Sequence, residues 1–169
     1  FDTQTLMLTT LERYIADVRS GKHKKAVEKV QAYLAASENE KAEAGKKRLP
    51  LLVPGGAMAG GRKLEHMVRY SGCICFDLDD VLLPPEQILS QAAQLGYVKA
   101  GHISPSHTGN KLFVLVDSDQ EHHLQAFEQV RAMIEKDLPG VTVDISGKDA
   151  NRGCFASYDP DAFYKEVAE

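Results

Sequence analysis

The chain has 169 residues, of which 43% are hydrophobic and 26% are charged, a composition typical of one ordinary globular domain. Its formal net charge of -4 gives no overall basic surface of the kind that marks many nucleic-acid-binding proteins. We find no apolar run of membrane-spanning length and no signal-peptide pattern, which argues against a membrane partner. The three cysteines are odd in number and lie in apolar segments, as expected for reduced thiols of a cytoplasmic protein.

Residues 1–48 are predicted to form a helical segment that packs on a core of residues 49–169, within a single compact domain. Two runs place apolar residues on one helical face: Leu11, Tyr14, Ile15 and Val18, and then Val27, Val30 and Leu34. Thr9 or Thr10 can cap the first helix, and Gly21 ends it. Residues 38–48 are charged and poor in large apolar side chains, so they form either an exposed helix or a mobile link.

Residues 49–61 differ from the preceding segment, because a short apolar run is followed by a glycine-rich turn. Gly61, Arg62 and Lys63 place two cations directly after the other glycines of this turn. The Gly-Lys-Ser/Thr ending of a phosphate-binding P-loop is absent. The sequence therefore favours a loop that leads into a short helix at residues 64–68.

Residues 73–79 predict a buried strand that ends in two acidic side chains. Because side chains alternate along a strand, Phe76 and Leu78 share one face while Asp77 and Asp79 share the other. Two neighbouring carboxylates repel each other unless a cation lies between them, and a divalent ion with hard oxygen ligands is the usual candidate. The alternative is a strand that simply runs into an acidic turn.

From this strand onward the periodicity predicts the order β-α-β-β-α-β. The expected elements are the strand at 73–79, a helix from Pro84 to Gly96, strands at 97–103 and 112–116 around the polar turn 104–111, a helix from the capping-box pattern at Ser118, a strand at 141–145, and a last strand at 152–158. This order is typical of ferredoxin-like and RNA-recognition folds. We therefore expect an α+β domain with an antiparallel sheet and an N-terminal helical extension.

The strand at 141–145 alternates strictly, with its valines and Ile145 on the core face and Asp144 opposite. We expect Asp144 to converge with Asp77 and Asp79 on one surface of the sheet. Three such carboxylates form the ligand set of a paired Mg²⁺ or Mn²⁺ site for phosphoryl or nucleotidyl transfer. The structural alternative for Asp144 is a solvated acid at a strand end.

Three cations, Lys111, Lys148 and Arg152, are predicted to lie near these acids at the ends of neighbouring elements. Such cations suit a triphosphate, because Arg forms paired hydrogen bonds and Lys acts as a point charge.

The histidines give a weaker indication of function than these acids and cations. An exposed loop residue is the simplest interpretation of His107, with a general acid or base or a phosphate contact as the alternative. His102 and His123 are interpreted as a strand-end and a helix-surface residue. No Ser-His-Asp or Cys-His pattern suggests a covalent hydrolase.

Several short motifs between Lys46 and Phe163 together resemble a known family. They are Leu49-Pro50 with Gly55-Gly56, Tyr70-Ser71-Gly72 before Asp77-Leu78-Asp79, Ser104-Pro105-Ser106 with Gly109-Asn110-Lys111, then Asp144, and Arg152 followed by Ser157-Tyr158-Asp159-Pro160. On these residues the chain resembles the VirE N-terminal domain family, a branch of the archaeo-eukaryotic primase superfamily of primase-polymerases.

The resemblance implies a metal-dependent nucleotidyltransferase of DNA primase/polymerase type. The implied catalytic residues and metal ligands are Asp77, Asp79 and Asp144, with Mg²⁺ or Mn²⁺ as the cofactor. The implied nucleotide-binding residues are Ser106, His107, Lys111 and Arg152. The chain departs from many active primase-polymerases at two of these positions, because Lys111 stands where they have histidine and His107 where glycine is more common.

The resemblance also implies partners. They are nucleoside triphosphates, a DNA or RNA template, and a helicase-like region of the same full-length protein. Such domains are similar to those in replication proteins of bacterial mobile elements. The resemblance therefore implies that the chain is the front part of a replication protein. Because the chain begins with Phe1 and not with Met, we also expect it to be a fragment.

Two rival interpretations remain open at this point. Residues 76–82 also fit the first motif of haloacid-dehalogenase phosphatases, in which Asp77 would be a nucleophile and Asp79 its general acid/base. That fold needs a parallel doubly wound sheet and a late acidic motif, which the sequence lacks. The other rival is a catalytically inactive module that binds nucleic acid or a partner on the same fold, although acids on the exposed sheet face would repel a phosphate backbone without metal.

Overall fold

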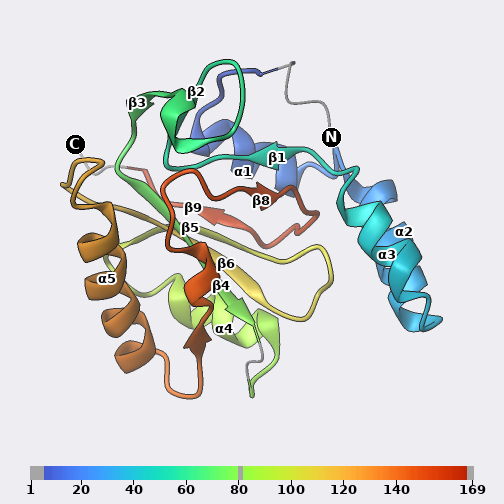
Figure 1. Cartoon of the computed structure of the whole chain (residues 1–169). Coiled ribbons are helices and arrows are strands. Elements are labelled where there is room, and N and C mark those ends of the chain that lie inside the picture. The colour runs from blue at the N-terminus through green and yellow to red at the C-terminus, as the bar shows by residue number, and fades with distance from the viewer. Residues whose placement is uncertain (1–5, 80–81, 167–169) are drawn as a thin grey trace.

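A computed structural model describes residues 6–79 and 82–166, so the turn predicted at Asp80 lies outside the described residues. The centre of the molecule is a five-stranded antiparallel sheet in the order β7-β4-β6-β5-β9 (Figure 1). The elements that build it and cover it are β4 (Cys73–Asp79), α4 (Pro85–Ala92), β5 (Val98–Ile103), β6 (Asn110–Leu115), α5 (His123–Asp137), β7 (Thr142–Val143) and β9 (Phe163–Tyr164). The predicted α+β class and β-α-β-β-α-β order are confirmed.

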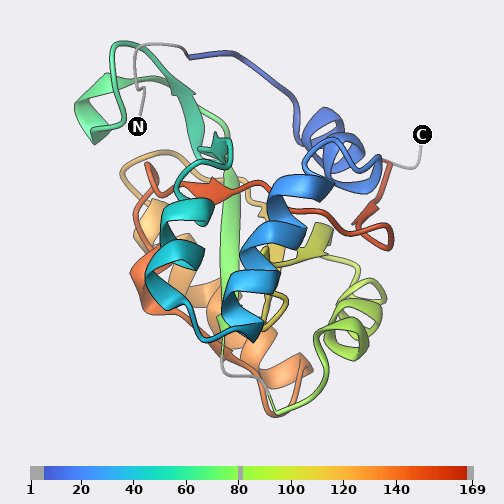
Figure 2. The ribbon, with the colours of Figure 1, turned by 90° about the vertical axis from the view of Figure 1, so that its right-hand side faces the viewer.

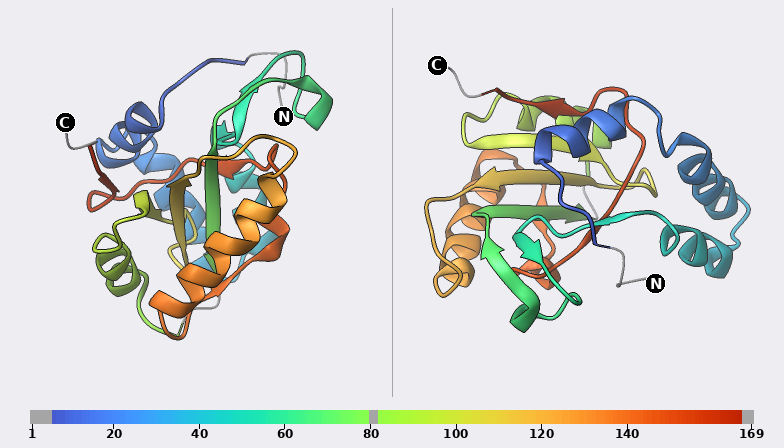
Figure 3. Two further views of the ribbon diagram at one scale, coloured as in Figure 1. Left: turned by 90° about the vertical axis from the view of Figure 1, so that its left-hand side faces the viewer. Right: turned by 90° about the horizontal axis from the view of Figure 1, so that it is seen from above.

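Helices α4 and α5 cover one face of this sheet (Figure 3). Alternation along β4 puts Phe76 and Leu78 into the core beneath them, and the Phe76 ring stacks on Phe127 of α5 with 5.1 Å between ring centroids. Burial of side chains of this size stabilises the fold by about 1.5–3 kcal/mol each. A slip of one residue would turn these side chains outward and Asp77 inward, so the core fixes which way the acids point.

The opposite face of the sheet is partly covered by α1 (Leu11–Arg19), as predicted for the first helix. Ile15 and Val18 of α1 pack in one apolar cluster with Phe113 of β6. Thr10 is the N-cap of α1, because its hydroxyl accepts a hydrogen bond from the Arg13 N–H at 3.1 Å.

Beside the sheet, α2 (Lys24–Ala35) and α3 (Asn39–Lys46) pack against each other (Figure 2). The first of these matches the second predicted helix. Residues 38–48 were expected to form either an exposed helix or a mobile link, and α3 shows that they form a helix. No helix in the described part of the chain is long and apolar enough to cross a membrane.

Two short antiparallel pairs lie outside the main sheet. They join β1 (Leu51–Leu52) to β8 (Cys154–Phe155) and β2 (Gly56–Met58) to β3 (Met67–Tyr70). The prediction of a helix at 64–68 is wrong. The structure has only a single 3₁₀ turn there, η1 (Leu64–His66), because the chain then turns back and pairs with β2. The last strand predicted at 152–158 is shorter and pairs with β1, and β9 supplies the edge of the main sheet instead.

The strand predicted at 141–145 is reduced to β7. The Asp144 carboxylate accepts the N–H of Ser146 at 2.8 Å and so caps a 3₁₀ turn, η2 (Ile145–Gly147), which ends the strand. Ile145 is consequently 56% exposed and not on the core face as predicted.

Candidate metal centre

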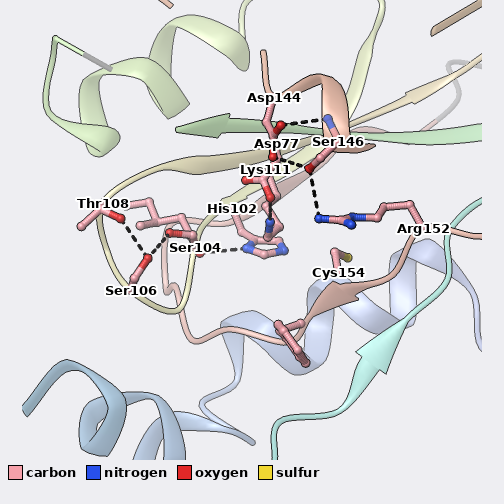
Figure 4. A network of polar contacts seen from close by, with 12 residues as sticks. Asp77, His102, Ser104, Ser106, Thr108, Lys111, Asp144, Ser146, Arg152 and Cys154 are labelled. Atoms are coloured by element: carbon pink, nitrogen blue, oxygen red, sulfur yellow. Dashed lines mark hydrogen bonds and ion pairs between the residues drawn. The ribbon is translucent and has the colours of Figure 1, made fainter. Parts of the chain in front are cut away.

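Three aspartates lie together at one end of the sheet. Asp77 and Asp79 are alternate residues of β4 and point to the same face, the one that α1 partly covers. The β4–β7 pairing places Asp79 opposite Thr142, and the Asp144 N–H donates to the Asp77 carbonyl at 2.9 Å. This backbone hydrogen bond holds Asp144 beside Asp77, as the sequence predicted (Figure 4).

The three carboxylates fit a divalent metal ion. One ligand oxygen from each of Asp77, Asp79 and Asp144 lies within 4.8 Å of the others. Opposite oxygen ligands of an octahedral Mg²⁺ are about 4.2 Å apart, since each bond is about 2.1 Å, so small side-chain rotations bring all three onto one ion. Asp77 Oδ1 is also buried without a hydrogen-bond partner among the described residues. A buried carboxylate oxygen is costly unless hydrogen bonds or a cation satisfy it.

Lys111 is a buried cation next to these acids. It lies opposite Asp77 in the β4–β6 ladder, and its ammonium donates a hydrogen bond to Asp77 Oδ2. The Lys111 side chain is only 10% exposed. Burial lowers the pKa of Lys111, but Asp77, Cys75 and Cys154 together more than offset this, and the pKa lies above its ordinary value. Lys111 therefore stays charged at neutral pH.

Arg152 reaches the same acids through a serine. Ser146 Oγ donates to Asp144 Oδ2 at 2.5 Å, and Arg152 Nη2 donates to Ser146 Oγ at 3.1 Å. The two hydrogen bonds from Ser146, and then the charges of Arg152 and Lys111, lower the pKa of Asp144. Asp144 is therefore held ionised and oriented, the state in which it can bind a cation.

A small pocket of about 10 Å³ opens beside the Asp77–Lys111 ion pair, large enough for a water molecule. Its lining residues are Cys75, Asp77, Lys111, Ser146, Gly147, Arg152, Gly153 and Cys154. The described cysteines are free thiols, as predicted. A hydrogen bond to Cys154, together with burial, raises the pKa of Cys75 well above its ordinary value. The same hydrogen bond lowers the pKa of Cys154, so Cys75 is the member of this pair that keeps its proton.

His102 lies at the end of β5, as predicted, and opposite Lys111 in the β5–β6 ladder, but it is fully buried. Its Nε2 is 3.0 Å from the Tyr14 hydroxyl of α1, and its Nδ1 is 2.9 Å from the Ile103 carbonyl. Burial lowers the pKa of His102 to about 4. A neutral histidine thus continues the row of polar side chains that runs across the sheet from Asp144.

His123 is likewise not a surface residue. It is only 5% exposed, and its Nδ1 is 2.8 Å from the Tyr70 hydroxyl of β3. This contact joins the start of α5 to the strand that precedes β4.

A comparison with protein-family models gives one match. The model of the BT4734-like N-terminal domain matches residues 44–164, which is most of the chain and includes every residue of the candidate metal centre. The chain belongs to this family. No curated protein and no solved structure matches it.

In this BT4734-like domain, the loop that holds Ser106 and His107 makes contacts of its own. Ser106 Oγ lies 3.1 Å from Ser104 Oγ and 2.9 Å from Thr108 Oγ1, a chain of hydroxyls within the loop (Figure 4). His107 adopts a φ of 62° and its Nε2 is 2.7 Å from Glu86 of α4. A role for these two side chains in nucleotide binding therefore stays a prediction, since their hydrogen bonds lie within the loop and on α4.

Gly109 is the point at which this loop touches the metal centre. A Cβ atom there would lie 2.2 Å from the Leu78 carbonyl oxygen and 2.9 Å from Asp79 Oδ1. We expect Gly109→Ala to lower the free energy of unfolding by about 3 kcal/mol, because backbone and not a flexible side chain must move. Urea unfolding measures this change. Gly96→Ala is the control, since no atom lies within 4 Å of its Cβ position, and a change beyond about 0.5 kcal/mol is not expected there.

The sequence did not point to Ser146 or to His102. An Asp-x-Ser spacing is a known side-chain-to-backbone capping pattern, so Asp144-Ile145-Ser146 carried a local signal for the first. His102 has no such signal, because its partner Tyr14 is far away in the sequence and meets it only through packing of α1 on the sheet.

Proposed function

We propose that this domain is a metal-dependent nucleotidyltransferase of DNA primase/polymerase type. The observation that carries the proposal is the convergence of the Asp77, Asp79 and Asp144 carboxylates. Two cations, Lys111 and Arg152, adjoin them. Acids that can hold a divalent ion next to cations that can hold phosphate are the combination that nucleotidyl transfer requires.

Each group has a distinct task in this proposal. When bound, Mg²⁺ or Mn²⁺ would lower the pKa of the attacking 3′-hydroxyl and offset charge on the leaving pyrophosphate. Arg152 lines the pocket beside Asp77 and has several guanidinium N–H donors, of which Nη2 binds Ser146, so it can also hold phosphoryl oxygens. The Lys111 ammonium has three donors and uses one on Asp77, which leaves others for a triphosphate.

The proposed partners follow from the same chemistry. The substrates would be nucleoside triphosphates and a DNA or RNA template, and the domain would form the N-terminal part of a replication protein of a bacterial mobile element with a helicase-like region. The resemblance to the VirE N-terminal and primase-polymerase motifs supports this more specific proposal.

The antiparallel pairing of β4 with both β6 and β7 argues against the phosphatase alternative, which needs a parallel sheet. The inactive binding module keeps one observation in its favour. Lys111 already neutralises Asp77, so the acids repel a phosphate backbone less than three bare carboxylates would. It is the second candidate function.

The test is extension of a primed template, together with dinucleotide synthesis from free nucleotides, with Mg²⁺ or Mn²⁺. We expect the wild-type domain to incorporate nucleotides and Asp77→Ala to be inactive. A wild type that does neither, and behaves as Asp77→Ala does, contradicts the enzyme proposal. Nucleic-acid binding that survives loss of all three aspartates would favour the binding module, and hydrolysis of a phosphomonoester that Asp77→Asn abolishes would favour the phosphatase.

A further inference from the structure

We propose that the aspartates hold a single divalent ion and that the Lys111 ammonium permanently occupies the place of a second one. This inference rests on the proposed function and specifies how its metal site is built. Sites that clamp both oxygens of a displacement use two metal ions about 3.5–4 Å apart that share a carboxylate. Asp77 would serve as such a shared carboxylate only with both of its oxygens, and Oδ2 already accepts a hydrogen bond from the Lys111 ammonium.

The two oxygens of Asp77 have different environments. Oδ2 accepts the hydrogen bond from Lys111, while Oδ1 is buried and has no hydrogen-bond partner among the residues that the structure describes. Only Oδ1 is therefore available to a metal ion without disruption of the ion pair. One carboxylate oxygen of each of Asp77, Asp79 and Asp144 lies within 4.8 Å of the others.

Lys111 cannot easily leave this place. Its backbone is fixed opposite Asp77 in the ladder between the two interior strands β4 and β6, and its own side chain is only 10% exposed. On the other side of Lys111, its neighbour on β5 is His102. This histidine is neutral and gives the Lys111 ammonium no second negative partner. The strand pairing and the hydrogen bond to Asp77 thus hold the ammonium in one place.

The charges also balance with one metal ion and not with two. The three negative charges of the carboxylates are already neutralised by one divalent ion and the Lys111 ammonium, before the charge of Arg152 is added. A second divalent ion would bring excess positive charge to the protein side of the site and would lie against the ammonium, with Arg152 close by. In a partly buried site such repulsion is weakly screened.

Binding of Mn²⁺ tests this inference without any measure of activity. Electron paramagnetic resonance counts bound Mn²⁺ and detects the coupling between two ions that lie close together. We expect the wild-type chain to bind one Mn²⁺ and to show no coupled pair, both alone and with the α,β-methylene analogue of deoxyadenosine triphosphate. Lys111→Met frees Asp77 Oδ2, so we expect a second Mn²⁺ and a coupled signal with the same analogue.

Matched variants separate charge from folding. Lys111→Arg keeps the cation and should bind one Mn²⁺, and Lys136→Met removes an exposed lysine of α5 and should behave as wild type. A coupled pair in the wild type, or a single uncoupled ion in folded Lys111→Met, overturns the inference while the proposed function stands. Absence of Mn²⁺ binding by the wild type, matched by Asp144→Asn, overturns both. If Lys111→Met does not fold, the wild-type count with the analogue still decides.

Discussion

Replacing Asp144 with asparagine is expected to lower nucleotide incorporation by about 1,000-fold while the fold remains intact. The loss is large because a metal ligand contributes several kcal/mol of charge stabilisation to the transition state, and each 1.4 kcal/mol is tenfold in rate. The fold should persist because asparagine is as good an N-cap as aspartate and can still accept the Ser146 N–H that starts η2. Single-turnover extension assays with Mn²⁺ measure the rate.

Asp149→Asn is the matched control, since it removes one carboxylate from an exposed position a few residues further along the same segment. Its rate should stay within about twofold of wild type, because a surface charge away from the reacting groups contributes little. A comparable loss in both variants would mean that net charge of the segment, and not ligation by Asp144, determines the rate.

Acid is expected to destabilise the domain through His102. Its pKa is about 4 in the folded protein and about 6.5 in an unfolded chain, so the unfolded state binds more protons between these values. The contribution of neutral His102 is fully present above pH 6.5 and is lost as the pH falls toward 4, by about 3 kcal/mol in total. Protonation would also give Nε2 a hydrogen that opposes the Tyr14 hydroxyl, which must then turn toward the Phe155 carbonyl.

Urea unfolding in EDTA at pH 7, 6, 5 and 4 measures this loss. His102→Gln should flatten the pH dependence by about 3 kcal/mol over that range, because glutamine keeps hydrogen-bonding atoms and has no proton to gain. His122→Gln, in which an exposed histidine is replaced, should keep the wild-type slope. Equal slopes in wild type and His102→Gln would show that other groups cause the acid sensitivity.

The part of the fold that the sequence predicted correctly is the part with strong local periodicity. Alternation at residues 73–79 gave β4, its two faces and the side to which Asp77 and Asp79 point. The 3.6-residue periodicity indicated α1, α2, α4 and α5, although α5 begins at His123 and not at Ser118, because the Asp119 carboxylate binds the His122 N–H and forms a turn there. Neighbouring strands then placed Asp144 correctly beside Asp77.

What the sequence could not supply was pairing between distant segments. Two-residue strands such as β8 and β9 are too short to carry a periodic signal, and their partners β1 and β5 lie far away along the chain. The candidate metal centre depends on distant pairing in the same way. Lys111 was predicted to be near the acids, but its pairing opposite Asp77 depends on the register of β4 and β6, which only the packed sheet determines.

The helices that pack on the sheet begin well before the family boundary. The family match begins at residue 44, whereas α1 ends at Arg19. Yet α1 supplies Ile15 and Val18 to the apolar cluster under Phe113, and Tyr14 to the hydrogen bond with His102. A chain cut at the family boundary would therefore open the sheet to water directly behind Lys111, and the dry surroundings that strengthen its ion pair with Asp77 would be lost. The N-terminal helix thus shields one side of the charged site from water, and its Tyr14 hydroxyl reaches Cys154 at the edge of the pocket.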